Sequence, residues 1–235
     1  MTNEREVRYM PMEVRAEQDE EKRAIIEGYP IVFNQETDMG DWRETIDPAA
    51  IGDGSILRDV ALMVGHDFGM IPMAHSRRNN ENSTMQLKPD EHGVHMRAVL
   101  DPDHNPRAAE AYSAVGRGDM TGMSFAFVVN EERWEELDTE KPLRRITGLR
   151  DIFEVSLVAF PAYKGTSVYQ AASEGDALES VRASLESARK QAEEERAAAA
   201  AEAEARAAEE AEAERRRAVL ERLENLTKEV KRNEV

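Results

Sequence analysis

The distribution of aromatic residues is the feature that most constrains this chain, because every Phe, Trp and Tyr lies at or before Tyr169. Residues 170–235 therefore have no ring around which a core could pack. No Gly or Pro follows Gly175, and this part is rich in Ala, Glu and Arg, which favour helix. The pattern predicts a folded domain over residues 1–170, a linker at 171–176, and a helical, scaffold-like or coiled-coil tail over 177–235.

Two apolar seams with heptad-like spacing lie in this tail. They consist of Leu178, Val181, Leu185, Ala188 and Ala192, and of Val219, Leu223, Leu226 and Val230. Between the seams the tail has only Ala to bury, so we expect its middle to be solvated. The apolar ends are suited to pairing with other helices.

Charge and cysteine content exclude several classes of function. The formal net charge is −17 and both parts of the chain are acidic, so we expect no nucleic-acid partner. Cys is absent, which excludes disulfides, thiolate metal sites and a Cys nucleophile. Residues 1–30 hold no long apolar stretch and no run reaches the length of a membrane span, so we expect neither a signal peptide nor a membrane partner.

Residues 1–170 alternate short apolar runs with turn residues, a pattern typical of β-strands. Strands are expected over residues 5–15, 24–33, 60–64, 85–87, 94–100, 122–129, 143–147 and 152–160. Asn105 followed by Pro106 predicts the start of a helix that stops at Gly116. The predicted fold class is α+β, mainly β, with a β-barrel or closed sheet decorated by helices.

Two side chains stand out as carriers of chemistry. Ser124 lies within the apolar run of residues 122–128, where a hydroxyl must be hydrogen-bonded or open to a cleft. It is either a nucleophile or a strand Ser satisfied by a backbone carbonyl or by solvent. His66 ends an apolar strand next to Gly65, a position suited to a general base, with an ordinary loop His as the alternative.

A third group would be a carboxylate that orients the imidazole. Glu154 lies in a very apolar strand, although it could simply face water, and Asp151 and Asp67 compete for the same role. A metal-dependent hydrolase using His66, Asp67 and His75 lacks sensible ligand spacing. We therefore expect neither a metal nor a cofactor.

Four blocks of this sequence, in their order and spacing, resemble the prohead (capsid maturation) serine proteases of tailed phages. The blocks are residues 28–34, residues 64–67 with 71–74, residues 123–127, and residues 154–158 with 161–167. The resemblance covers about residues 5–170 and none of the tail. It implies a fold similar to that of the herpesvirus assembly proteases, a closed β-barrel ringed by helices.

The resemblance also implies roles for particular residues. Ser124 is the expected nucleophile, which forms an acyl-enzyme, and His66 is the expected base. Position in the closing strand favours Glu154 as the third member. The herpesvirus relatives carry a His in this role and the closing block here has none, so either a carboxylate replaces it or only a dyad of Ser124 and His66 exists. Backbone N–H groups near Lys164 and Gly165 are expected to form the oxyanion hole, in a turn where those relatives carry arginines.

The function implied is that of a serine endopeptidase that cleaves capsid and scaffold proteins, and itself, during prohead maturation. The expected place is the host cytoplasm, inside the assembling prohead. The expected partners are the major capsid protein and the scaffold as substrates, with self-association through the tail or the barrel. The alternative is a non-catalytic scaffolding or structural protein that uses its helical tail.

Overall fold

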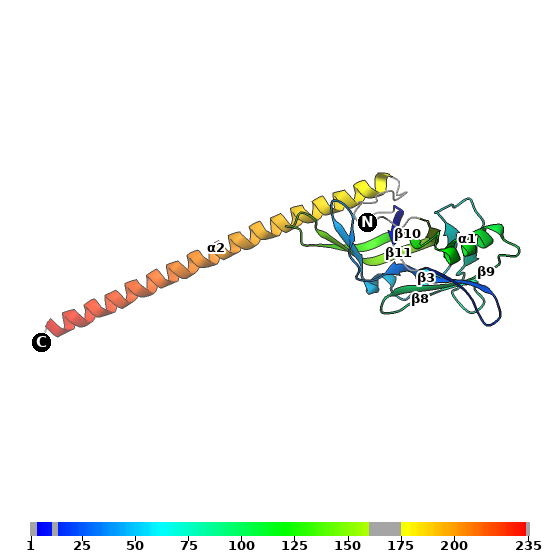
Figure 1. The fold of residues 1–235 in the computed structure, drawn as a ribbon. Helices are drawn as coiled ribbons and strands as arrows, with labels where there is room; N and C mark the ends of the chain where they lie inside the picture. Colours follow the sequence, from blue (N-terminus) through cyan, green and yellow to red (C-terminus); the bar gives the residue numbers. More distant parts are fainter. Residues whose placement is uncertain (1–3, 11–13, 160–174, 234–235) are drawn as a thin grey trace. The chain divides into compact units, whose positions relative to one another are not determined.

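The computed structural model describes residues 4–10, 14–159 and 175–233. Within these ranges the chain forms eleven β-strands, two short 3-10 turns and two α-helices (Figure 1). It divides into two compact units, Met1–Leu185 and Glu186–Val235. The strands all belong to the first unit, and they form two sheets.

The larger sheet is organised around two long antiparallel strands, β10 and β11. Its main path is β1 (Glu6–Met10), β10 (Gly122–Glu135), β11 (Leu143–Val158), β5 (Arg43–Ile46) and β4 (Thr37–Asp38), with β6 (Ala61–Val64) and β7 (Ala74–His75) attached beside it. The first half of β11 pairs in parallel with β5, and its second half pairs in parallel with β6. One strand therefore joins two regions that are distant in sequence.

The smaller sheet contains four antiparallel strands. In spatial order they are β2 (Arg15–Gln18), β3 (Ala24–Val32), β9 (Gly93–Leu100) and β8 (Met85–Pro89). The β3–β9 pairing is interrupted between Gly28 and Ile31, which marks a bulge. Gly93 permits the close approach there, because a Cβ at this position would lie 2.1 Å from the Ile31 carbonyl oxygen.

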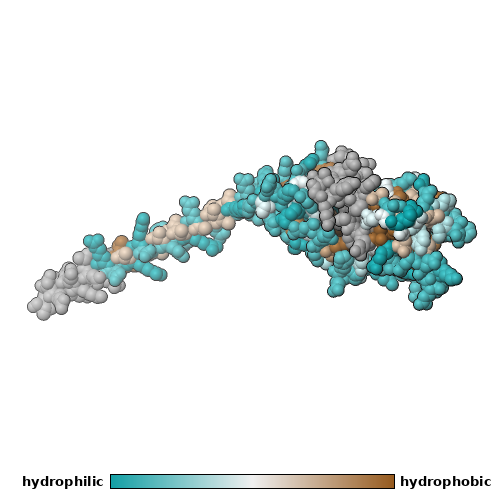
Figure 2. All heavy atoms as spheres, in the orientation of Figure 1, coloured by the Kyte–Doolittle hydropathy of each residue, from teal (hydrophilic) through white to brown (hydrophobic). Residues whose placement is uncertain are grey.

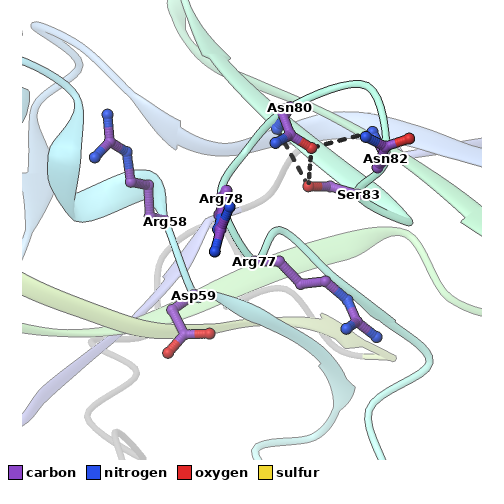
Figure 3. Close-up of a pocket in the computed structure, with 7 residues that line it drawn as sticks. All are labelled: Arg58, Asp59, Arg77, Arg78, Asn80, Asn82 and Ser83. Carbon is purple, nitrogen blue, oxygen red and sulfur yellow. Dashed lines mark hydrogen bonds between the residues drawn. The ribbon is translucent and has the colours of Figure 1, made fainter.

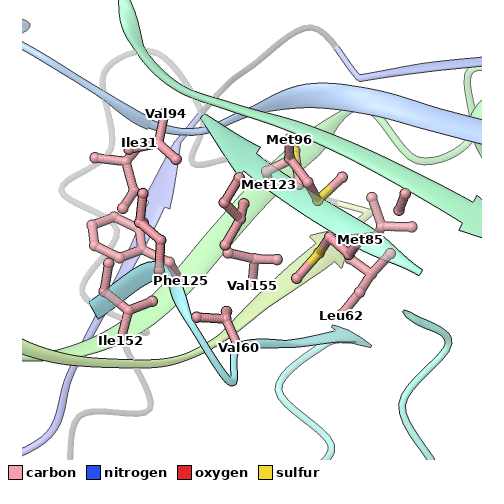
Figure 4. Close-up of a cluster of buried hydrophobic side chains, with 14 of the residues drawn as sticks. Ile31, Val60, Leu62, Met85, Val94, Met96, Met123, Phe125, Ile152 and Val155 are labelled. Carbon is pink, nitrogen blue, oxygen red and sulfur yellow. The ribbon is translucent and has the colours of Figure 1, made fainter. Parts of the chain in front are cut away.

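A single apolar cluster fills the space between the two sheets. Figure 4 shows side chains of both sheets meeting in it, among them Ile31, Met85, Val94 and Met96 from the smaller sheet and Leu62, Met123, Phe125, Ile152 and Val155 from the larger. Burial of these side chains stabilises the fold by about 1.5 to 3 kcal/mol for each large one. Only one face of the larger sheet packs in this core, and the side chains of its opposite face lie outside the cluster.

The expectation of a closed β-barrel ringed by helices is wrong. The sheets are open: β1 and β4 end the path of the larger sheet, and hydrogen bonds do not close either sheet on itself. A barrel requires its first and last strands to pair. Here the apolar side chains that alternate along the strands are buried between two open sheets. Most strand connections are loops or the 3-10 turns Pro48–Ile51 and Ser55–Leu57, so no ring of helices exists in the described part of the chain.

Helix α1 (Pro106–Arg117) begins as the sequence predicts. The Asn105 side chain accepts hydrogen bonds from the backbone N–H groups of Arg107 and Ala108 and so caps the first turn. The helix continues past the expected stop at Gly116 and ends at Arg117, where Gly118 forms the C-cap with a left-handed φ of 77°. Other boundaries differ as well. Residues 5–15 contribute to two strands in different sheets, residues 143–158 form one strand rather than two, and the strand expected over 122–129 continues to Glu135.

Five buried or partly buried charged side chains join strands β1, β5, β10 and β11. Arg8 and Arg144 lie among three carboxylates, from Glu6, Glu44 and Glu132. Arg144 Nη1 lies 2.7 Å from Glu6 Oε2 and 2.8 Å from Glu44 Oε2. Burial raises the pKa of Glu6, but the charges and hydrogen bonds of Arg8 and Arg144 outweigh it and lower this pKa to about 2.

The first turns of helix α2 (Gly175–Asn233) pack on the strand-rich unit. Val181 and Leu185 are buried, and Val181 forms a small cluster with Met39 and Trp42. Polar contacts add to this packing, since Arg182 Nη2 lies 2.9 Å from Asp41 Oδ2. The apolar seam that we expected to pair with another helix is therefore covered in part by the chain's own first unit.

Beyond Leu185 the described side chains of α2 are nearly all exposed, as the teal and tan surface in Figure 2 illustrates. Val219 and Leu220 are 59% and 61% exposed. The side chains of the remaining second-seam positions, at 223, 226 and 230, lie outside the described residues. Neither described helix is long and apolar enough to cross a membrane.

The packing of α2 predicts different outcomes for two truncations. A chain that ends at Leu185 should keep the unfolding free energy of the strand-rich unit. A chain that ends at Gln170 should lose about 3 to 6 kcal/mol, because two buried aliphatic side chains are removed. Urea denaturation followed by circular dichroism measures both values.

Matched substitutions in the full chain separate packing from length. Replacing Val181 and Leu185 by Ala should destabilise the unit, whereas replacing the exposed Val219 and Leu220 should not. Equal stability of the two truncated chains would contradict the packing described for Val181 and Leu185.

The lowered pKa of Glu6 predicts acid sensitivity. Its folded pKa lies below the ordinary value, so its stabilisation is present above about pH 4.5 and is lost as the pH falls toward 2. The expected loss is about 3 kcal/mol. Urea denaturation at a series of pH values should give a shallower dependence for Glu6→Gln, and an unchanged one for the exposed Glu110→Gln. Parallel curves for Glu6→Gln and the unaltered chain would show that Glu6 is not the group responsible.

Candidate active site

His66 is presented by a tight turn at the end of β6. Gly65 and His66 both have left-handed backbones, with φ values of 59° and 61°. This conformation suits Gly but costs a His on the order of 1 kcal/mol, and such strain is common at functional sites. Two hydrogen bonds tie the turn to β11: Gly65 N–H donates to the Leu157 carbonyl at 3.0 Å, and His66 N–H donates to Ser156 Oγ at 3.0 Å.

Glu154 lies directly against the imidazole. The distance from His66 Nδ1 to Glu154 Oε1 is 2.6 Å, and both side chains are buried. Ser156 Oγ donates to the other carboxylate oxygen at 2.5 Å. When the carboxylate accepts at both oxygens, the proton of a neutral His66 imidazole lies on Nδ1, and Nε2 carries the ring lone pair.

Ser124 occupies the same face of the larger sheet. In the register of β10 with β11, Ser124 lies opposite Ser156 and Ala126 lies opposite Glu154. Opposed residues of an antiparallel pair share a face, with Cβ atoms about 5 Å apart. The fold thus brings Ser124 and Glu154 together from neighbouring strands, and β6 delivers His66 from the far side of β11.

The hydroxyl of Ser124 donates to the backbone carbonyl of Arg8 in β1 at 2.6 Å. Ser124 is fully buried. A hydroxyl has one proton, so in this conformation it cannot also donate to His66. The sequence left two alternatives for Ser124, a nucleophile or a hydroxyl satisfied by a carbonyl, and the described contact is of the second kind.

The two competing carboxylates have other partners. Asp67 Oδ1 accepts from the Gly69 N–H at 3.0 Å, within the loop that follows His66. Asp151 Oδ2 lies 2.7 Å from Arg150 Nε on a partly exposed stretch of β11. Lys164 and Gly165, expected at the oxyanion hole, lie outside the described residues.

In the described part of the chain, His66, Ser124 and Glu154 line neither a metal site nor the surface pocket beside Arg58 and Arg77. Within the described ranges no three His, Asp or Glu side chains are grouped so that they could hold a metal ion. His75 is at the end of β7, with Nε2 3.7 Å from Asp59 Oδ1. A surface pocket is lined by Arg58, Asp59, Arg77, Arg78, Asn80, Asn82 and Ser83, and Figure 3 shows the side chains of Arg58 and Arg77 extending in different directions.

Sequence reasoning missed Ser156. One signal was available: Glu154 and Ser156 are two residues apart in a strand, and this spacing places both side chains on one face. A Ser in an apolar strand has no distinguishing mark beyond that. The hydrogen bond from the His66 N–H to its hydroxyl depends on the packing of the His66 turn against β11, which the sequence does not show.

The chain is similar in sequence to known proteins over most of its strand-rich unit. The family model described as caudovirus prohead serine protease matches residues 10–180, a range that includes His66, Ser124 and Glu154. The chain is 29% identical to the prohead protease of Enterobacteria phage HK97 over 163 residues, which are 68% of this chain and 65% of that protein. The match thus spans slightly less than two thirds of that relative. No solved structure matches this chain significantly.

The contact between His66 and Glu154 predicts the tautomer of the imidazole. In ¹⁵N NMR spectra at alkaline pH, His66 should show a protonated Nδ1 and an unprotonated Nε2, because the carboxylate accepts at Nδ1. Glu154→Ala should shift His66 toward the other tautomer. Asp101→Ala, which removes the partner of the exposed His104, should leave His66 unchanged. A dominant Nε2–H form of His66 in the unaltered chain would contradict the geometry.

Proposed function

Because the chain belongs to the caudovirus prohead serine protease family, we propose that it is a serine endopeptidase of capsid maturation with its centre at Ser124, His66 and Glu154. The observation that carries the proposal is the buried 2.6 Å contact between His66 Nδ1 and Glu154, on the face of the larger sheet that also holds Ser124. A carboxylate that orients an imidazole beside a Ser is the arrangement of a catalytic triad.

The proposed reaction proceeds through an acyl-enzyme. Nε2 of His66 takes the proton of Ser124 while Oγ bonds to the scissile carbonyl carbon, and Glu154 stabilises the resulting imidazolium. The tetrahedral intermediate collapses and breaks the C–N bond, and His66 gives its proton to the leaving amine. Water, activated by the same imidazole, then hydrolyses the ester and restores Ser124.

The described conformation requires a change before this reaction. The Ser124 hydroxyl donates to the Arg8 carbonyl, and Ser124 and Glu154 are fully buried. A substrate must therefore uncover Ser124, and the hydroxyl must turn from Arg8 to His66. We assign the oxyanion hole to backbone N–H groups near Lys164 and Gly165, where loss of one donor typically costs about 3 kcal/mol of transition-state stabilisation.

The proposed substrates are the major capsid protein, the scaffold and the chain itself, cleaved inside the assembling prohead in the host cell. The exposed part of α2 beyond Leu185 suits a second role, contact with helical scaffold proteins that would carry the enzyme into the shell. The alternative function, a scaffolding or structural protein without activity, would use this same segment and would not need the contact between His66 and Glu154.

Substitution at the three side chains tests the proposal. Ser124→Ala and His66→Ala should each lower cleavage on the order of 10⁴-fold or more, and Glu154→Gln should cause a smaller but clear loss. The purified chain is incubated with its capsid protein, and new termini are mapped by mass spectrometry. Ser113→Ala on α1 and His75→Ala on β7 serve as matched controls and should cleave normally.

Circular dichroism melting of each variant confirms that it is folded before its activity is compared. Cleavage at a normal rate by folded Ser124→Ala would rule out this Ser as the nucleophile. Absence of cleavage by the unaltered chain under conditions that mature the capsid would favour the scaffolding alternative.

A further inference from the structure

We infer that Ser156 is a positioning residue for the proposed reaction, one that fixes both the carboxylate and the histidine turn through a single hydroxyl. This inference rests on the proposed function and deepens it. Ser156 is fully buried on β11 and none of the sequence motifs assigned it a role. It acts through Glu154 and His66 and has no contact with substrate in this scheme.

The hydroxyl of Ser156 makes two hydrogen bonds, one as a donor and one as an acceptor. It donates to Glu154 Oε2 at 2.5 Å and accepts the backbone N–H of His66 at 3.0 Å. Its one proton is thereby committed to the carboxylate. This distinguishes Ser156 from Ser124 on the adjacent strand, whose hydroxyl donates only to a backbone carbonyl and is free to change partner by rotation.

The bond to Glu154 sets the orientation of the carboxylate. Glu154 is fully buried, and its two oxygens have different donors, His66 Nδ1 and Ser156 Oγ. With a donor at each oxygen, the carboxylate is restrained from rotating away from His66. Without Ser156, Oε2 would lose its donor in a buried setting, and the group could rotate away from the geometry that holds His66.

The bond to His66 supports a backbone that is unfavourable by itself. The φ of 61° at His66 is left-handed, and the neighbouring Gly65 is left-handed as well. The N–H of His66 ends on Ser156 Oγ, so the same hydroxyl that orients the acid also holds the turn. Ser156 also stands in register between Ser124 on β10 and Met63 on β6, midway between the strands that supply nucleophile and base.

Kinetics of Ser156→Ala provide the first test. We expect kcat to fall about 10- to 100-fold, because a displacement of about 1 Å can cost this much. KM should change less than about twofold, since Ser156 does not touch substrate. Ser156→Thr, which keeps the hydroxyl, should recover most of kcat. The matched control is Ser76→Ala, because Ser76 is also fully buried and accepts a backbone N–H, that of Val60, but has no carboxylate partner among the residues that the structure describes.

A double-mutant cycle separates positioning from general loss of stability. If Ser156 acts through Glu154, then Ser156→Ala should cost far less in the Glu154→Gln background than in the unaltered chain. An equal cost in both backgrounds, or a kcat within about twofold of normal, would overturn the inference. Should Ser156→Ala unfold, Ser156→Cys retains the size but donates weakly, and the same comparison is made with it.

A spectroscopic readout decides the case independently of proteolysis. The proton shared between His66 Nδ1 and Glu154 should give a downfield ¹H NMR resonance that is lost or broadened in Ser156→Ala and kept in Ser76→Ala. An unchanged resonance in Ser156→Ala would overturn the inference even if activity fell. Conversely, if Ser124→Ala still cleaves, the proposed function fails, while a resonance that depends on Ser156 still establishes the positioning contact.

Discussion

The buried ion network around Arg8 and Arg144 is the constraint on which the rest of the structure depends. Charges this deep are tolerated only when paired, and removal of one partner typically costs about 3 to 5 kcal/mol. The network joins β1 to three other strands of the larger sheet. It therefore fixes the register of β1 on β10, and with it the Arg8 carbonyl that receives the hydroxyl of Ser124.

Strand β11 connects the ion network to the candidate site. Its first half carries Arg144 of the network, and its second half carries Glu154 and Ser156. Because the acid, its bridging hydroxyl and the anchor of the His66 turn all lie on this one strand, their spacing follows from regular β-geometry. Two hydrogen bonds then hold the turn of His66 on the same strand.

The sequence drew attention to the residues of the candidate site more readily than to the architecture. Ser124 and Glu154 were conspicuous because polar groups in apolar strands need partners, and the alternation of these strands placed them correctly in a sheet. Alternation alone does not distinguish two packed sheets from a closed barrel, so the barrel was wrong. Two strands were expected, over residues 143–147 and 152–160, where the chain forms the single strand β11. The burial of Val181 depends on Met39 and Trp42, which are far away in sequence.

The corner where α2 begins has a practical consequence for spectroscopy. Both tryptophans of the chain lie there: their rings are 6.1 Å apart, Trp42 contributes to the cluster with Val181, and Trp134 Nε1 donates to Ser184 on the helix. All tryptophan fluorescence of this protein therefore comes from rings that lie beside the first turns of α2. Its wavelength and intensity form a native optical probe of whether those first helical turns are docked, one that needs no introduced label.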